Sequence, residues 1–217
     1  MKKYYIILIF SVLTFFGTPR VYSQSFNAGL IAGAAFSQVD GDHYGGFHQL
    51  GWTLGAYVNL PFNDYLSGQM ELKYSLLGAR SSVTEVVDYG YNVYDLRLHY
   101  AEIPLMLRYN LGSFKISGKK LDFITLEAGV GLDFRMKATE DVNGDFQVTT
   151  QRWNFFSATG NAGVHFAITD HWGFGARFMY SIVPIRFNPD SPNIFYGHYY
   201  NKVWQATVTY NFKSPLK

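Results

Sequence analysis

The stretch HYAEIPLMLRYNL, from His99 to Leu111, alternates apolar and polar side chains as a β-strand does, yet it carries Pro104 in its middle. Proline removes a ladder hydrogen bond and is normally excluded from the interior of a sheet. The alternation sets Pro104 on the polar face, together with Glu102 and Arg108. We therefore predict a strand that loses one ladder bond at Pro104 and forms a bulge or kink there, with Arg108 as the candidate to cap the freed carbonyl group.

Seven other segments show the same period of two, and after Gln24 no long segment has a helical period. These segments cover residues 26–37, 52–60, 69–76, 124–135, 156–166, 172–182 and 204–212. With the opening stretch they make eight strands. At 217 residues, the chain has room for about one domain of this kind.

The connections between the eight strands alternate in length. Short connections lie at Pro61–Tyr65 and Thr169–His171, with an intermediate one at Gly112–Lys120. Long connections lie at residues 38–48, 79–95, 137–151 and 184–199. Short turns at one end and long loops at the other are typical of an all-β, antiparallel, up-and-down transmembrane barrel of the outer membrane. We expect both termini and the short turns to face the periplasm and the long loops to be extracellular.

The apolar strand faces are predicted to contact lipid. An eight-stranded barrel has an interior just wide enough for side chains to fill, and aromatic residues at 18% of the chain are too many for it. Charged residues, at 16%, are too sparse for a soluble surface. The expected lipid-facing aromatic girdle comprises Trp52, Tyr74, Phe134, Phe156, Trp172, Tyr180, Trp204, Tyr210 and Phe212. A soluble ligand-binding barrel of lipocalin type, which would bury this face, is the alternative fold.

The inward faces collect charged residues of both signs. They are Glu71, Lys73, Glu102, Arg108, Glu127, Asp133, Arg135, Lys137 and Arg177. Because buried charges are costly unless they are paired, we predict a salt-bridge network that fills the lumen as structural packing. A selectivity ring or a proton path is the functional alternative.

The N-terminus has the features of a cleavable signal peptide over residues 1–23. Lys2 and Lys3 precede an apolar run from Tyr4 to Phe16, which is too short to span a bilayer as a helix. The barrel domain is then 24–217, exported to the outer membrane. Cleavage after residue 23 would remove Lys2, Lys3 and Arg20 and change the formal charge from +2 to −1. A chain of this charge does not favour a nucleic-acid partner.

The stretch YAEIPLMLRYNL, the Gly- and Ala-rich first strand and the terminal VTYNF make the chain resemble the PorT-like family of outer-membrane β-barrel domain proteins. The likeness spans the mature chain, and the strand-breaking motif Glu102, Ile103 and Pro104 is its most specific part. The resemblance implies an eight-stranded outer-membrane barrel. It also implies, by analogy of fold, an accessory part in protein secretion.

Candidate catalytic and metal-binding residues are few. The chain has no cysteine, and its six histidines are scattered. His99 near the outer rim could serve an outer-leaflet hydrolase, but no spacing supplies the nucleophile and the orienting acid. The acidic stretches 40–46 and 140–146 could hold calcium but lack the spacing of a calcium loop; Asn143-Gly144 more simply predicts a hairpin tip.

The function expected from these features is non-enzymatic and needs no cofactor. The long loops Val86–Asp95 and Asn188–Tyr200 are rich in Tyr and Asn, which are common in adaptable binding surfaces. The periplasmic turn with Lys115, Lys119 and Lys120 could meet an acidic partner or lipid headgroups, or simply be solvated. We expect a loop-presenting or accessory envelope component. The alternatives are a small porin-like channel and the outer-leaflet hydrolase.

Overall fold

The computed structural model describes residues 26–42, 44–88, 90–116, 119–187 and 198–212. The predicted signal peptide lies outside these residues, as does most of the loop Asn188–Tyr200. Within the described ranges there are nine strands: β1 (Asn27–Asp40), β2 (Gln49–Pro61), β3 (Leu66–Arg80), β4 (Tyr94–Ile116), β5 (Lys119–Val142), β6 (Asp145–Val148), β7 (Phe156–Ala167), β8 (Trp172–Ser181) and β9 (Tyr200–Phe212). The short helices are α2 (Val83–Val87) and η1 (Thr150–Arg152). No described helix is long and apolar enough to cross a membrane.

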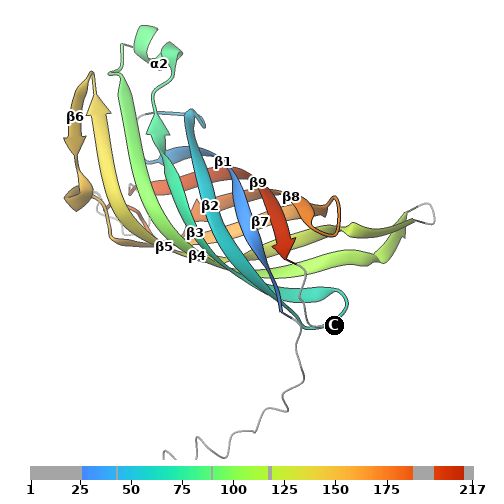
Figure 1. Cartoon of the computed structure of the whole chain (residues 1–217). Helices are drawn as coiled ribbons and strands as arrows, with labels where there is room; N and C mark the ends of the chain where they lie inside the picture. The colour runs from blue at the N-terminus through green and yellow to red at the C-terminus, as the bar shows by residue number, and fades with distance from the viewer. Residues whose placement is uncertain (1–25, 43, 89, 117–118, 188–197, 213–217) are drawn as a thin grey trace, which may run out of the picture.

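Eight of these strands close into an antiparallel barrel, which confirms the predicted fold class (Figure 1). Neighbours follow the order β4-β3-β2-β1-β9-β8-β7-β5, and the pairing of β4 with β5 closes the ring. The first strand pairs with the last, from Ala28 opposite Phe212 to Asp40 opposite Tyr200. The short β6 stands outside the ring and pairs only with the end of β5 among the described strands.

Side chains on the barrel wall alternate between an exposed apolar face and a buried polar face. In β9, Trp204 is 49% exposed, whereas its neighbours Val203 and Gln205 are buried. Trp52 and Trp172, on opposite parts of the wall, are 46% and 51% exposed. A soluble protein hides such residues, so an outer surface made of them belongs in lipid.

Pro104 interrupts one ladder but forms no bulge. The pairing of β3 with β4 is absent at Pro104 and resumes in the same register, with Met70 opposite Leu105 and Lys73 opposite Glu102. On its other side Pro104 remains in register with Gly131 of β5. The predicted bulge is therefore wrong, because proline lacks only its N–H group and the strands stay in phase around that one missing bond.

Within the barrel wall, the register between β4 and β5 shifts instead at Met136. His99 pairs with Lys137 and Tyr100 with Arg135, so Met136 is an extra residue in β5. Met136 and Lys137 are both exposed, and the next luminal position belongs to the fully buried Ala138. The expectation that Lys137 points inward is thus wrong, since one extra residue reverses the faces of the strand beyond it.

Two connections differ from the expected loops. The connection predicted at Gly112–Lys120 is largely strand, because β4 runs to Ile116 and β5 begins at Lys119, and this hairpin projects beyond the barrel at the short-turn end (Figure 1). At the long-loop end, the predicted hairpin tip is present: Asn143 and Gly144 have positive φ angles of 55° and 87°. It joins β5 to the short β6 and not to the next barrel strand.

Candidate functional site

Arg177 lies at the centre of an ionic cluster inside the barrel. Its Nη1 and Nη2 donate to the two carboxylate oxygens of Glu71, both at 2.8 Å. Its Nε and Nη2 also donate to Oε1 of Glu127, at 3.0 and 2.8 Å. All three side chains are buried. The planar guanidinium group suits this arrangement because it offers five N–H donors in a fixed fork.

The cluster continues through Lys73 and Arg108. Nζ of Lys73 lies 3.3 Å from Glu71 and 3.5 Å from Glu102, with the side chains of both pairs fully buried. Arg108 donates to Gln69 at 2.6 Å, and its Nε lies 3.4 Å from Glu127. Arg108 therefore contacts side chains of the cluster. The prediction that it caps the carbonyl group freed by Pro104 is wrong.

Two predicted members are buried without joining an ion pair among the described residues. Asp133 stands directly opposite Glu102, and one carboxylate oxygen of each has no hydrogen-bond partner there. Arg135 donates from Nε to the carbonyl oxygen of Asn154, at 3.0 Å. The luminal cluster, defined from here on as Glu71, Lys73, Glu102, Arg108, Glu127 and Arg177, thus joins β3, β4, β5 and β8.

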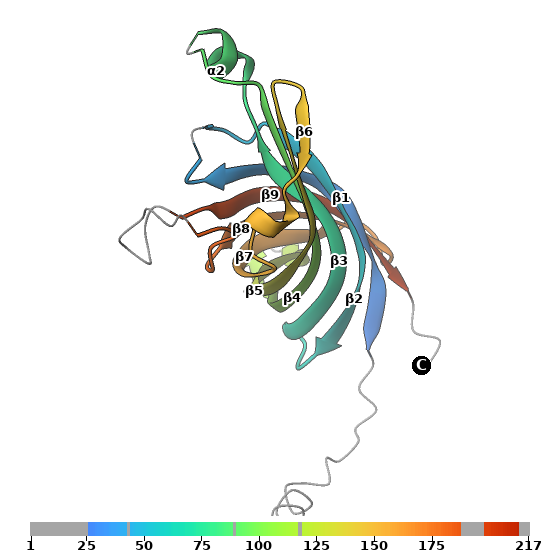
Figure 2. The same cartoon turned by 90° about the vertical axis from the view of Figure 1, so that its left-hand side faces the viewer.

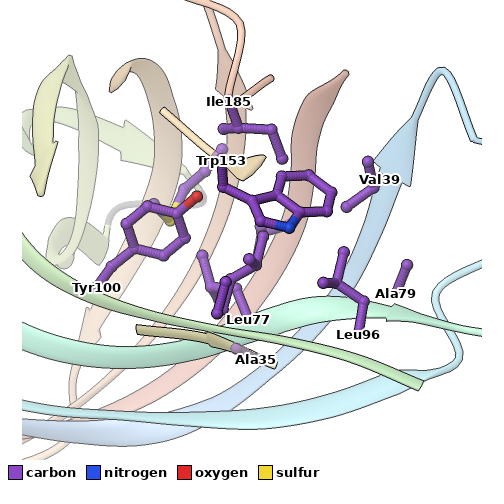
Figure 3. Packing of buried hydrophobic residues seen from close by; sticks show 12 residues of the cluster. Ala35, Val39, Leu77, Ala79, Leu96, Tyr100, Trp153 and Ile185 are labelled. Carbon is purple, nitrogen blue, oxygen red and sulfur yellow. The ribbon is translucent and has the colours of Figure 1, made fainter. Parts of the chain in front are cut away.

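A layer of apolar side chains packs together inside the barrel (Figure 3). It lies on the long-loop side of the luminal cluster, because its strand residues are close to the long-loop ends of their strands. Its side chains come from six strands and from two loops. We define this apolar plug as Ala35, Val39, Leu77, Ala79, Leu96, Leu98, Tyr100, Ala138, Trp153, Met179, Ile185 and Val203. Sequence reasoning missed the layer, although the apolar residues at inward positions of the alternation, such as Tyr100 and Met179, were a usable signal.

Trp153 is the part of the plug contributed by the loop after η1. It is only 4% exposed, and its Nε1 donates to Glu140 at 3.0 Å. The guanidinium of Arg186 lies 5.4 Å from the Trp153 ring and 5.2 Å from the Tyr199 ring. These cation–π contacts add to a backbone hydrogen bond of 2.7 Å from Asn154 to Ile185, and together they hold the loop over the lumen. Period-two alternation cannot reveal such a residue because Trp153 lies in a loop.

Above the plug, part of the wall continues as an extracellular sheet. Figure 1 and Figure 2 show β4, β5, β6 and α2 extending beyond the neighbouring strands. The helix α2 starts with a capping box between Ser82 and Glu85. Glu85 also accepts a hydrogen bond of 2.6 Å from the backbone of Gly45, which ties the first long loop to α2.

Aromatic stacking makes a second link between these loops. The ring of Tyr44 stacks on Tyr94 with centroids 4.7 Å apart and planes 6° apart. The backbone N–H of Tyr44 donates to Asp42 at 3.1 Å. Burial is the main cause that raises the pKa of the Asp42 carboxyl to about 7. The charge of this loop therefore changes near neutral pH.

The predicted girdle residues form ring pairs on the outer wall. Trp52 lies 5.2 Å from Tyr74, and Trp172 lies 4.9 Å from Tyr210, between ring centroids. The hydroxyl of Tyr74 also bonds Nδ1 of His99 at 2.5 Å. The partner of His99 is therefore the phenol of a girdle residue.

No group of three or more His, Asp or Glu that could hold a metal ion occurs in the part of the chain that the structure describes. In the two acidic stretches, Asp42 and Asp141 instead accept backbone hydrogen bonds from their own turns, Asp141 from Gly144 at 2.9 Å. Of the periplasmic lysines, Lys115 and Lys120 pair across the hairpin and are exposed.

The family model of the outer membrane protein beta-barrel domain matches residues 8–212. No curated protein matches the chain. Among solved structures, Ail of Yersinia pestis has 16% identity, a TM-score of 0.49 and coverage of 86% of this chain and 98% of its own. Neisserial surface protein A has 14% identity and a TM-score of 0.48, and the match covers 86% of this chain and 97% of its own. The outer membrane enzyme PagL has 12% identity and a TM-score of 0.41, and the match covers 87% of this chain and 99% of its own. The narrower PorT-like assignment stays a prediction.

Proposed function

Because the chain belongs to the outer membrane protein beta-barrel domain family, we propose that it is a non-enzymatic integral barrel that presents its long-loop end to a protein partner. In this role it is a loop-presenting or accessory component of the cell envelope, and an accessory role in protein secretion is its narrower form. Export through the signal peptide 1–23 is part of the proposal. The observation that carries it is the filling of the lumen, which leaves the outside of the barrel as the working surface.

The two filled layers argue against a channel. A pore needs a continuous wet path, and here the apolar plug covers the buried luminal cluster. Trp153 and Ile185 come from loops, so the plug is closed by the same segments that form the extracellular end. Moving ions past Arg177 would also require breaking its paired contacts with Glu71 and Glu127, which is costly in a buried site.

The long-loop end offers an ordered apolar surface. Val83 and Val87 of α2 are 80% and 71% exposed, and Phe146 and Val148 of β6 are 61% and 64% exposed. These residues stand beyond the barrel wall, where lipid does not cover them. Exposed apolar groups on an ordered extracellular surface are typical of a protein-binding site.

Support for a non-enzymatic role comes from the rim histidine. A hydrolase needs a nucleophile, a base and an orienting group within hydrogen-bond reach. His99 instead bonds Tyr74, whose ring also packs against Trp52 in the girdle. This environment is that of an interfacial anchor.

The test is affinity purification of the tagged barrel from outer membranes in mild detergent, followed by mass spectrometry. One variant replaces residues 82–93 by Asn-Gly, a two-residue hairpin turn that joins Ser81 to its pairing partner Tyr94. The matched control replaces residues 111–124 by Asn-Gly, which joins Asn110 to its partner Thr125 at the opposite end. We expect a stoichiometric protein partner that the first variant loses and the control keeps. A wild-type barrel that purifies alone would contradict the proposal.

A further inference from the structure

A groove with a volume of about 470 Å³ opens on the outer wall of β2, β3 and β4, towards the short-turn end. Its walls include Phe26, Phe62, Met70 and Leu107, each of them about half exposed. Gly68 lies among them, between its cross-strand neighbours Leu60 and Leu107. The groove exists because this position of the lipid-facing row carries no side chain.

The ring of Phe62 leans over this gap. A Cβ atom added to Gly68 would lie 2.8 Å from Cζ of Phe62, and its three nearest atoms all belong to that ring. Phe62 is therefore the movable wall of the groove. Because the nearby atoms belong to the far end of a flexible side chain, a larger residue at Gly68 can be accommodated by rotating the ring and filling the gap.

None of the described residues that line the groove is charged. Gln69 and Met106 complete the lining, but their side chains point into the lumen and are only 5% and 3% exposed. Gln69 uses its amide group inside the barrel, where it bonds Glu71 and Arg108. The groove thus offers no polar side chain to a ligand, which excludes recognition of a headgroup or of a polar metabolite.

We propose that this groove is a binding site for one acyl chain of a phospholipid of the periplasmic leaflet. The groove is continuous with the lipid-facing belt and lies in its periplasmic half, where phospholipid chains surround it. It binds the chain and not the headgroup, so phosphatidylethanolamine and phosphatidylglycerol bind equally. The site is separate from the long-loop surface and goes beyond the proposed function.

The test uses nanodiscs that contain either phospholipid with a photoreactive diazirine in its acyl chain. After irradiation, mass spectrometry compares labelling of Met70, Leu105 and Leu107 with labelling of Val208 and Phe174, which are 45% and 40% exposed on β9 and β8, away from the groove. We expect the groove residues to be labelled preferentially, and equally with both headgroups. Labelling that merely follows exposed area around the barrel would overturn the proposal, and a strong headgroup preference would contradict headgroup-independent binding.

Two glycine variants separate groove binding from general lipid contact. Gly68→Leu fills the groove and should lower the preferential labelling about tenfold. This is the loss expected when about two methylene groups of the acyl chain are no longer buried in the groove. Gly160→Leu is the matched control, because Gly160 also faces outward and the nearest atom to its Cβ would be one of Ile182, at 3.6 Å. It should leave the labelling of the groove unchanged. Unaltered labelling in Gly68→Leu would refute the site.

A further variant covers the remaining outcomes. If Gly68→Leu does not fold, Phe62→Ala removes the movable wall and must lower the same labelling.

The other possible occupant of the groove is a second copy of the chain. A photoreactive methionine analogue at Met70 that yields covalent dimers in place of lipid adducts would identify that occupant and overturn the acyl-chain assignment.

Discussion

Arg177 and Glu71 form a two-pronged ion pair inside the barrel, with both N–H···O contacts at 2.8 Å across 106 residues of sequence. The pair joins β8 to β3, which lie on opposite parts of the wall. It therefore acts as a cross-brace of the lumen, in addition to the ladders between neighbouring strands.

Removing one partner of this pair should destabilise the barrel strongly. The luminal cluster balances three acids with three bases, so Glu71→Gln leaves one uncompensated buried positive charge next to Lys73 and Arg177, and we expect a loss of about 3–5 kcal/mol in the free energy of unfolding. Urea unfolding in lipid vesicles measures it. Arg97→Met is the control, because the Arg97 side chain is 56% exposed in its pair with Asp95 and such pairs contribute about 0–1 kcal/mol. Equal effects of the two variants would contradict the cross-brace.

Removing the charge of Asp133 should not destabilise the barrel, unlike removing a charge of the luminal cluster. It is 4% exposed, has no ion pair among the described residues and faces a second carboxylate, that of Glu102. Asp133→Asn removes a buried charge without leaving a cation unpaired, so it should cost less than about 1 kcal/mol or stabilise the barrel. Glu127→Gln, measured in the same urea assay, should destabilise instead. A large loss in Asp133→Asn would show that Asp133 has a cationic partner.

Trp153 should stabilise the barrel without being its only seal. Trp153→Ala removes a buried ring and should cost about 3–5 kcal/mol, measured by the urea dependence of the heat-modifiable gel shift. Phe155→Ala, at a side chain that is 65% exposed, should stay within about 0.5 kcal/mol. In planar bilayers Trp153→Ala should remain non-conducting, since the luminal cluster still crosses the lumen. Steady conductance in this variant would favour the channel alternative.

The first extracellular loop should be more stable in acid than in alkali. Burial raises the pKa of Asp42 from 3.8 to about 7, so the folded loop binds a proton that the unfolded chain releases more readily. Its stabilising contribution is complete below about pH 4 and is lost as the pH rises through 7. Hydrogen exchange of the Gly45 amide, which donates to Glu85 and not to Asp42, should after correction for intrinsic rates show more protection at pH 5 than at pH 8. Asp42→Asn should abolish the difference; an unchanged difference would point to another group.

Much of the barrel could be predicted from the sequence because alternation is local. Successive side chains of a strand point to opposite faces, so Trp204 and Val208 share a face whatever their partners are. The contrast of short and long connections then indicated an even-stranded, up-and-down barrel. The same local rule failed at Lys137, because nothing in its neighbourhood marks Met136 as an extra residue.

The sequence by itself determined the strands, their outward faces and the presence of inward charges, since each follows from residues two positions apart. Only the tertiary structure decided which charges meet. Arg177 reaches Glu71 and Glu127 because closure of the ring and the tilt of its strands bring distant β8, β3 and β5 around one narrow lumen. The inward position of Trp153 and the groove at Gly68 were also decided by the tertiary structure. Both depend on contacts between residues that are distant in the sequence, which the local pattern does not contain.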